Sequence, residues 1–270
     1  MISQPRIAVI GVGSIGSKHI DRLLELGYQD IVGVEPRPMP HDERIPIVSH
    51  LEDIEASPTH VIICTPPDSH YKYASHFLDN GIYTFIEKPM TLNASQAKIL
   101  CEKAKLKKVV LAVGYMERAH HIVKSARKYV KSLVSWNPLS SGYIDCHWKA
   151  TEKTYPLSVA AESSHAIDTA QFVFGRITAV KKAVVKPTSC TIDVVCEEDV
   201  TVCISMDMNA SPVRRIRVYS KSDVFVSTYG SGPHEWEQCY KDELLAFLMG
   251  VPLCDGVDGA RVVGVLEDLR

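Results

Sequence analysis

The sequence predicts an α/β fold with a parallel sheet in its N-terminal part and a mostly antiparallel sheet in its C-terminal part. Three observations support this prediction. A glycine-rich turn stands between an apolar run and a helical pattern near the start of the chain. Apolar runs then alternate with helical patterns up to about Gly114, which is typical of βαβ units in a parallel sheet. Later, five β-rich runs are joined by short polar turns, as in an antiparallel sheet.

The first element is the apolar run Ile7–Ile10, which leads directly into the sequence G-V-G-S-I-G at residues 11–16. A strand, this glycine spacing and a following helix are together typical of a dinucleotide-binding turn, whereas a flexible surface turn is the alternative. Glycine permits the sharp turn and the close approach of a pyrophosphate, and the helix N-terminus offers N–H groups to phosphates. We therefore expect the cofactor to be bound by Gly11, Gly13, Ser14, Ile15 and Gly16.

The second apolar run, at residues 31–34, ends at Glu35, and about twenty residues separate Glu35 from the last glycine of the turn. A carboxylate at this place accepts hydrogen bonds from the ribose hydroxyls of NAD and repels the 2′-phosphate of NADP. Arg37 favours NADP instead, because a nearby arginine accommodates the 2′-phosphate. We expect NAD, with NADP as the alternative, and assign Glu35 and Arg37 to the cofactor site. A solvated glutamate at a strand end is the other interpretation.

Three further strands are expected at 61–64, 84–86 and 109–113. Prolines between residues 35 and 47 exclude the helix that usually follows the second strand. Ligands of an open parallel sheet bind beyond the C-terminal ends of the strands, so residues directly after these runs are candidate site residues. In chain order, these are Thr65, Pro66, Pro67, His70, Glu87, Lys88, Tyr115 and Arg118.

The pattern changes at residue 119, so we expect one domain in residues 1–118 and a second α/β domain in residues 119–270. The second begins with a basic helix near 119–134, a strand at 143–149 and a helix near 157–173. The five β-rich runs follow near 177–185, 190–197, 200–208, 214–219 and 223–228. Helical patterns near 235–250 and 257–269 close the chain.

Composition and charge narrow the class of protein. A chain of 270 residues with 46% apolar and 23% charged residues is typical of a globular protein of two domains. A net charge of −2 gives no attraction to nucleic acid or to an anionic membrane, so small molecules and copies of the chain are the expected partners. Neither a secretory signal pattern nor a membrane-spanning apolar stretch is visible, which predicts a cytoplasmic protein. The eight cysteines include no C-x-x-C pair, so we expect no metal site.

Five motifs in this order resemble the Gfo/Idh/MocA family of nicotinamide-dependent oxidoreductases. They are the glycine turn, T-P-P-D-S-H at 65–70, E-K-P at 87–89, G-Y-M-E-R at 114–118 and H-A-I-D at 165–168. The resemblance implies a Rossmann domain joined to a smaller α/β domain whose open, mostly antiparallel sheet is often used for oligomerisation. It also implies that Lys88 and His165 flank substrate and nicotinamide, while Pro66 and Pro67 form the wall along the cofactor.

The residue types suit those roles. Lys88 follows a buried strand and precedes a proline that restricts its backbone, so we expect its ammonium to be held in place and to stabilise a developing alkoxide. The alternative is an ordinary surface lysine. Glu87 is expected to position Lys88. Imidazole, with an unperturbed pKa of ~6.5, accepts a proton at neutral pH, which makes His165 the candidate acid–base residue. His70 is expected at the cofactor wall or as a helix cap.

A substrate rich in hydroxyl groups needs several convergent polar side chains. Glu162, His165 and Asp168 are spaced three apart and share one face of the expected helix. We assign Glu162, Asp168, Tyr115 and Arg118 to substrate binding. The alternative for the three residues on the helix face is that this face is solvated. The alternative for Tyr115 is a packed aromatic residue at a strand end, and for Arg118 it is an arginine held in a salt bridge.

The chain departs from the family pattern beside this histidine. Many members carry an aspartate four residues before it, but this chain has Ala161 there and Glu162 one place later. One residue turns a helical side chain by about 100°, so whether Glu162 replaces the missing carboxylate stays open.

The sequence therefore predicts an NAD(P)-dependent oxidoreductase that transfers a hydride between nicotinamide and a carbinol or carbonyl carbon of a small polyol, sugar or sugar derivative. The cofactor carries the hydride chemistry, so no metal is required. Two alternatives remain. One is a reductase of a conjugated compound such as a linear tetrapyrrole, which a small second domain would suit. The other is a noncatalytic dinucleotide-binding regulatory protein. We expect a homo-oligomer formed through the C-terminal sheet.

Overall fold

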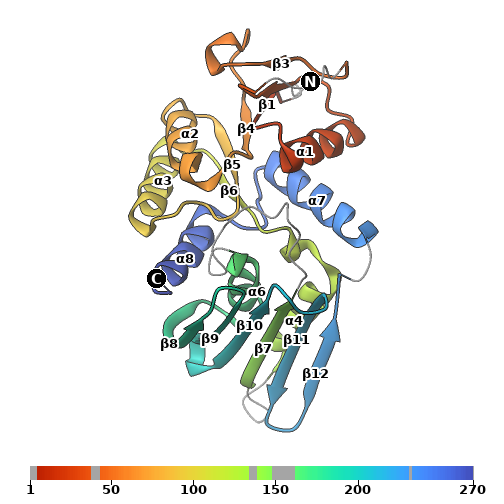
Figure 1. The fold of residues 1–270 in the computed structure, drawn as a ribbon, viewed down its shortest axis with the longest axis vertical. Coiled ribbons are helices and arrows are strands. Elements are labelled where there is room, and N and C mark those ends of the chain that lie inside the picture. Colours follow the sequence, from red (N-terminus) through yellow and green to blue (C-terminus); the bar gives the residue numbers. More distant parts are fainter. Residues whose placement is uncertain (1–4, 38–42, 134–138, 148–161, 231–232, 270) are drawn as a thin grey trace. The chain divides into compact units, whose positions relative to one another are not determined.

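The chain forms two compact units, each with one six-stranded sheet (Figure 1). The computed structural model describes residues 5–37, 43–133, 139–147, 162–230 and 233–269. The first unit comprises Met1–Tyr115 with Tyr240–Val263, and the second comprises Met116–Cys239 with Gly264–Arg270. This division differs from the expected one at residue 118, because the segment 240–263 joins the first unit.

The first sheet is parallel throughout, with strand order β3-β2-β1-β4-β5-β6. Its strands are β1 (Ile7–Ile10), β2 (Ile31–Val34), β3 (Ile47–Val48), β4 (His60–Ile63), β5 (Tyr83–Glu87) and β6 (Leu111–Gly114). All residues of β1 and β6 are buried, as expected of strands covered on both faces. Strand order reverses between β1 and β4, which is where ligands of such sheets bind. The expected Rossmann topology is confirmed; the two-residue strand β3 was not foreseen.

Three helices belong to the βα crossovers of this sheet: α1 (Ser14–Glu25), α2 (Pro67–Asp79) and α3 (Ala94–Lys107). The helix α1 buries one face, formed by Gly16, His19, Ile20 and Leu23. Pro67 stands at the first position of α2, where its missing N–H costs nothing. The side chain of Asn93 caps α3 by accepting from the backbone N–H groups of Ser95 and Gln96. A short 3-10 helix, η1 (Leu51–Asp53), lies between β3 and β4.

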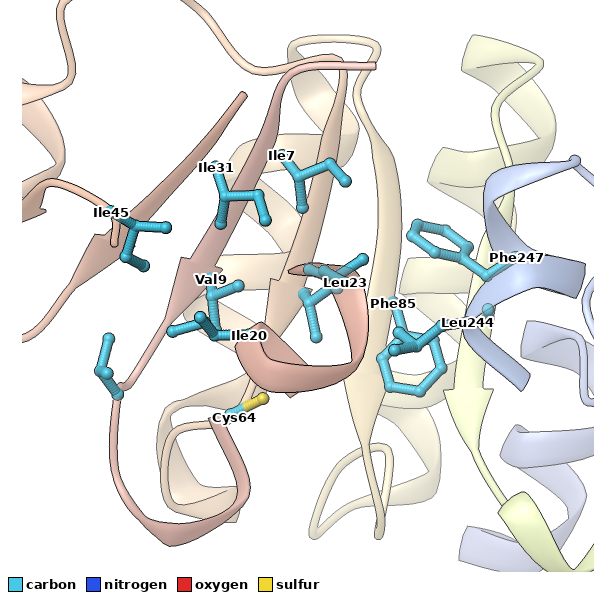
Figure 2. Packing of buried hydrophobic residues seen from close by; sticks show 13 residues of the cluster. Ile7, Val9, Ile20, Leu23, Ile31, Ile45, Cys64, Phe85, Leu244 and Phe247 are labelled. Atoms are coloured by element: carbon cyan, nitrogen blue, oxygen red, sulfur yellow. The ribbon is translucent and has the colours of Figure 1, made fainter. Parts of the chain in front are cut away.

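Residues far apart in the sequence share the core of this unit (Figure 2). Leu244 and Phe247, from helix α7 (Pro233–Leu248), are fully buried in the same cluster as Ile7 and Phe85. The ring centroids of Phe85 and Phe247 lie 5.6 Å apart. Further along, Asp255 pairs with Ala112 in an isolated β-bridge, just before helix α8 (Gly256–Glu267). These contacts explain why residues 240–263 belong to the first unit.

The second sheet has the order β12-β11-β7-β10-β9-β8, and only its β7–β10 pair is parallel in the described residues. Its strands are β7 (Leu139–His147), β8 (Ile177–Val185), β9 (Ser189–Cys196), β10 (Thr201–Asp207), β11 (Val213–Ser220) and β12 (Val224–Thr228). Helices α4 (His121–Ser132) and α6 (Ser164–Phe174) pack against this sheet, and alternate residues of β7 and β10 are buried. The expected mostly antiparallel sheet is confirmed.

Two short 3-10 helices complete the second unit: η2 (Met116–Ala119) and η3 (Glu197–Asp199). All eight cysteines are free thiols. Among the helices that the structure describes, none has both the length and the apolar character needed to cross a bilayer.

Candidate functional site

The glycine turn between β1 and α1 is held tightly by its own backbone. Gly11 has a φ of +88°, a conformation that favours glycine, and a Cβ there would lie 3.0 Å from the backbone of Cys64 and Thr65. A Cβ on Gly16 would overlap the carbonyl oxygen of Gly11. The fold itself therefore requires glycine at both positions.

Gly13 differs from Gly11 and Gly16, because no described atom lies closer than 3.8 Å to where a Cβ would be. The nearest atom to a Cβ at this position would be Nη2 of Arg37, 3.8 Å away, and the backbone angles of φ −77° and ψ −160° suit any residue. Gly13 is the N-cap of α1, no side chain caps the helix there, and its first turn carries no acidic residue. This open backbone at a helix N-terminus fits a pyrophosphate, to which Ser14 and Ile15 would present their N–H groups.

Glu35 lies beside this turn, at the end of β2. Its carboxylate is buried and accepts the backbone N–H of Val12 at 3.2 Å. Arg37 donates to it from Nε at 2.8 Å, from Nη2 at 3.0 Å and from its backbone N–H at 3.2 Å. These hydrogen bonds lower the pKa of Glu35, against the opposing effect of burial. The acidic residue of the fingerprint is thus in place, with a largely exposed guanidinium paired to it.

His70 connects the two loops that follow β4 and β5. Its Nε2 lies 2.7 Å from the carbonyl oxygen of Thr65, and its Nδ1 lies 3.0 Å from that of Pro89. Burial lowers the pKa of His70, so the neutral ring is favoured and donates to one carbonyl at a time. Next to it, the hydroxyl oxygen of Ser69 lies 2.7 Å from Thr65 Oγ1 and 2.7 Å from the Pro66 carbonyl oxygen. His70 therefore binds the T-P-P loop to the E-K-P loop.

Glu87 holds the backbone of Lys88. Its Oε2 accepts the backbone N–H of Lys88 at 3.2 Å, and its Oε1 lies 2.7 Å from Nε2 of His19 on α1. The carboxylate also packs on Gly114, where a Cβ would lie 3.1 Å from either oxygen. The Lys88–Pro89 peptide bond is cis. Sequence reasoning missed His19, although a spacing of three from Gly16 and four from Leu23 placed it on the buried face of the helix.

In the second unit, Asp168 is buried and pairs with Arg118. Nε and Nη2 of Arg118 donate to its two oxygens at 2.9 and 2.7 Å, and Gln171 donates to it at 3.1 Å. The guanidinium lies 5.1 Å from the ring centroid of Phe172. This is the salt-bridged arginine that the sequence analysis gave as the alternative for Arg118.

The remaining sequence candidates have varied surroundings. Tyr115 is fully buried at the end of the first unit's β6 segment. His165 lies on α6 and Glu162 just before it, and both are partly exposed. Ala161 lies outside the described residues. Lys88 belongs to the first unit and His165 to the second, so their joint action is part of the proposal below.

A buried carboxylate that sequence reasoning did not select, Glu117, lies at the centre of a polar cluster in the second unit. It accepts from Arg214 Nε at 2.7 Å, from the Tyr229 hydroxyl at 2.9 Å and from the Thr169 hydroxyl at 3.2 Å. Burial acts to raise the pKa of Glu117, but electrostatic interactions with Arg214 and His165, together with the hydrogen bonds from Arg214 and Tyr229, outweigh burial and lower the pKa.

The same cluster affects the partners of Glu117. Burial, with the nearby Glu117 charge, raises the pKa of Tyr229 well above its ordinary value. Burial disfavours the charged form of Arg214 and acts to lower its pKa. The neighbouring Glu117 carboxylate outweighs burial, so the pKa of Arg214 is raised. Glu117 is therefore ionised near neutral pH and lies close enough to His165 to act on it electrostatically. Within the described ranges, no three His, Cys, Asp or Glu side chains are arranged to hold a metal ion.

Comparison with protein families places the first unit. Residues 5–115 match the Gfo/Idh/MocA model, described as an oxidoreductase family with an NAD-binding Rossmann fold. The UDP-N-acetylglucosamine 3-dehydrogenase of Acidithiobacillus ferrooxidans is 28% identical over 127 residues, 46% of this chain and 41% of the relative. The inositol 2-dehydrogenase of Rhodococcus erythropolis is 30% identical over 131 residues, 43% of this chain and 37% of the relative. The matched segments thus span about two fifths of these relatives.

Solved structures are similar over the whole chain. The A. ferrooxidans UDP-N-acetylglucosamine 3-dehydrogenase superposes with a TM-score of 0.80 and 19% identity, covering 100% of this chain and 97% of that one. The WlbA dehydrogenase of Thermus thermophilus, solved in complex with NAD and UDP-GlcNAcA, has a TM-score of 0.80 and 15% identity, with 97% and 94% covered. At these identities the similarity demonstrates a shared fold.

Proposed function

We propose that the chain is an NAD(P)-dependent dehydrogenase of the Gfo/Idh/MocA oxidoreductase family, whose NAD-binding Rossmann model matches residues 5–115. Its substrate is a small polyol, sugar or sugar derivative, including nucleotide-linked sugars. The open backbone at Gly13 is the observation that carries this proposal. A glycine that the protein itself does not require, at an uncapped helix N-terminus, is explained by a phosphate ligand.

The proposed substrate class is based on what the relatives and structural neighbours are named for. Two of them are named as dehydrogenases of UDP-N-acetylglucosamine and of inositol, and one structural neighbour was solved with UDP-GlcNAcA. These compounds are rings with several hydroxyl groups. An enzyme that oxidises one hydroxyl of such a ring needs a proton acceptor and a group that stabilises charge on oxygen.

Cofactor binding is assigned to the residues around the glycine turn and the adjoining loops. The backbone of Gly13, Ser14 and Ile15 holds the pyrophosphate, and Glu35 with Arg37 holds the adenosine ribose. Thr65, Pro66 and Pro67 form the wall of the site, while His70 fixes that wall to the loop carrying Lys88. When bound, the nicotinamide supplies the hydride acceptor or donor.

The reacting hydroxyl is assigned to Lys88 and His165. Lys88, with its backbone held by Glu87, stabilises negative charge on the substrate oxygen. His165 takes the hydroxyl proton during oxidation and returns it during reduction, and the nearby ionised Glu117 favours the imidazolium that forms. Of the four residues assigned to substrate binding, Glu162 keeps that role in the proposal. Tyr115, Arg118 and Asp168 are buried and are assigned a supporting role.

The assay that tests this proposal follows nicotinamide absorbance with NAD and with NADP. The panel contains UDP-N-acetylglucosamine, myo-inositol, scyllo-inositol, free glucose and biliverdin. Turnover of a polyol or sugar supports the proposal. Turnover of biliverdin alone would identify a bilin reductase, and tight NAD(H) binding without turnover of any compound would favour a noncatalytic protein.

Single substitutions assign the roles. Lys88→Met and His165→Ala should each lower kcat roughly 10²- to 10⁴-fold, as expected when a charge-stabilising or acid–base group is removed. The matched controls are Lys107→Met and His234→Ala, because both side chains are exposed. Equal rates in the test and control variants would refute the assignment.

We also propose a homo-oligomer formed through the face of the second sheet that α4 and α6 do not cover. Two strand residues that support this, Val224 and Val226, are about half exposed although apolar. Sedimentation equilibrium of the wild type and of Val226→Lys would test the interface.

The eight free thiols agree with a reducing compartment such as the cytoplasm.

A further inference from the structure

His19 is fully buried on α1, although nothing in the proposed chemistry uses it. Its ring lies edge-on to Phe85, with centroids 5.5 Å apart, and to Tyr240, with centroids 5.8 Å apart. Placing an imidazole among apolar rings costs free energy unless the ring is hydrogen-bonded. A residue kept at this position therefore needs a compensating interaction.

Glu87 provides that interaction, at 2.7 Å between Oε1 and His19 Nε2. Nδ1 of His19 is buried and has no hydrogen-bond partner among the described residues. A proton on Nδ1 would be an unsatisfied buried donor, so the geometry assigns the donating N–H to Nε2. His19 therefore donates to Glu87, and a hydrogen bond to a carboxylate is among the stronger ones in proteins.

The carboxylate of Glu87 has little freedom to move. Both oxygens lie beside Gly114, where a Cβ in place of the glycine hydrogen would be 3.1 Å from each of them. The second oxygen accepts the backbone N–H of Lys88 at 3.2 Å. A shift of the carboxylate would therefore change the hydrogen bond that holds the Lys88 backbone.

We propose that His19 is a positioning residue, which acts through Glu87 to fix the position of the Lys88 backbone relative to helix α1. The same helix presents its N-terminus at Gly13, so two consecutive hydrogen bonds connect the proposed pyrophosphate site to the proposed catalytic lysine. The catalytic part of this inference rests on the proposed function of Lys88. The positioning part does not, because it concerns the backbone alone.

Two variants separate donation by His19 from simple filling of space. His19→Leu fills the pocket without a donor, whereas the amide nitrogen of His19→Gln can replace Nε2. His60→Leu is the matched control, since His60 is another histidine of the same unit that packs on aromatic rings, Tyr83 and Phe247, without contacting Glu87.

The first readout is amide hydrogen exchange of Lys88 in the full-length protein, measured by NMR. A hydrogen bond to a carboxylate is worth roughly a tenfold to hundredfold change in an equilibrium, so His19→Leu should speed Lys88 exchange by about that factor. His19→Gln and His60→Leu should leave it near the wild-type rate. Unchanged exchange in His19→Leu would overturn the proposal, whether or not the protein is a dehydrogenase.

The second readout is the split between kcat and cofactor affinity, measured with the substrate found by the panel above. His19→Leu should lower kcat about tenfold or more, with the Kd for NAD changed less than about twofold, and His19→Gln should restore most of the loss. An equal loss of kcat in His60→Leu, or a loss of NAD affinity alone, would assign His19 a merely structural role. If no compound is turned over, the exchange measurement alone decides.

Discussion

The guanidinium of Arg37 pairs with the carboxylate of Glu35 through two hydrogen bonds, at 2.8 and 3.0 Å. The two residues to which the proposal assigns opposite effects on cofactor choice are thus bound to each other. The carboxylate suits the ribose hydroxyls of NAD, and the guanidinium suits the 2′-phosphate of NADP. If both residues lie at the adenosine ribose as proposed, their pairing offsets the negative charge that a 2′-phosphate would meet.

Replacing Arg37 should therefore shift cofactor preference toward NAD. In Arg37→Ala, NADP loses a charged partner and meets an unneutralised Glu35, so its affinity relative to NAD should fall roughly tenfold to hundredfold. Thermal stabilisation by each cofactor over a range of concentrations measures the ratio. Arg261→Ala removes an arginine paired with Asp258 and serves as the control. An unchanged ratio in Arg37→Ala would exclude Arg37 from cofactor selection.

Alanine at Gly13 and alanine at Gly16 should have different effects on stability and on cofactor affinity. Gly13→Ala has room in the protein, so stability should be unchanged while NAD(H) affinity falls by tenfold or more, because the methyl group occupies the proposed pyrophosphate space. Gly16→Ala overlaps the Gly11 carbonyl and should destabilise the unit by about 1–3 kcal/mol. Urea unfolding and calorimetric titration with NADH distinguish the two effects.

Gly264→Ala is the control for this pair. It adds a methyl group in helix α8, where no described atom beyond the helix's own backbone and the neighbouring residues lies within 4 Å of the new Cβ, and should be neutral or stabilising by up to about 1 kcal/mol. Full NADH affinity in Gly13→Ala would contradict the pyrophosphate assignment.

The Arg118–Asp168 pair should be essential for stability. Removing one partner of a buried ion pair leaves an uncompensated charge, so Asp168→Ala should lower the free energy of unfolding by about 3–5 kcal/mol. Arg176→Ala, which breaks the half-exposed pair with Glu197, should cost less than about 1 kcal/mol. Urea unfolding monitored by circular dichroism provides both values. A stable Asp168→Ala protein with a raised KM would instead support a substrate-binding role.

Glu117 should make the protein's stability depend on pH. Electrostatic interactions with Arg214 and His165, together with the hydrogen bonds from Arg214 and Tyr229, outweigh burial and lower the folded-state pKa of Glu117 below its unfolded value. Its contribution is therefore fully present above the unfolded pKa and is lost as pH falls through the folded pKa. Glu117→Gln should be less stable than the wild type at pH ~7 by about 2–4 kcal/mol, and this difference should shrink on acidification.

Urea unfolding at several pH values tests the Glu117 prediction. Glu267→Gln, at an exposed position at the end of α8, is the control and should track the wild type at every pH. A stability difference for Glu117→Gln that stays constant, or grows, in acid would show that the Glu117 charge is not stabilised in the folded protein.

Local pattern was sufficient to foresee most elements of the fold. Apolar runs and turn residues located β1, β2 and β4 within a residue or two, and the alternation of β8 to β12 indicated an antiparallel sheet. Strand β3 escaped because two paired residues carry no periodic signal. Strand β7 begins at Leu139, before the expected start at residue 143, because Ser141 and Gly142, which are typical turn residues, here pair with neighbouring strands.

The sequence pointed to the candidate residues whose positions depend on backbone geometry and overlooked those that depend on side-chain partners. Gly11, Gly16 and Glu35 occupy the positions that the fingerprint requires. Glu117 was overlooked because Arg214 and Tyr229, its partners, are 97 and 112 residues away. His19 had a readable signal, as a polar residue on the buried face of a helix, but its partner Glu87 is 68 residues away.

By itself, the sequence determined the order and type of most elements and the glycine turn, because these depend on backbone conformations that neighbouring residues control. Only the tertiary structure decided which distant side chains meet: Asp168 with Arg118, His19 with Glu87, and Leu244 and Phe247 with the first sheet. A helical pattern states which face is apolar but not which surface will cover it. That choice depends on packing between segments far apart in the chain, which local periodicity does not encode.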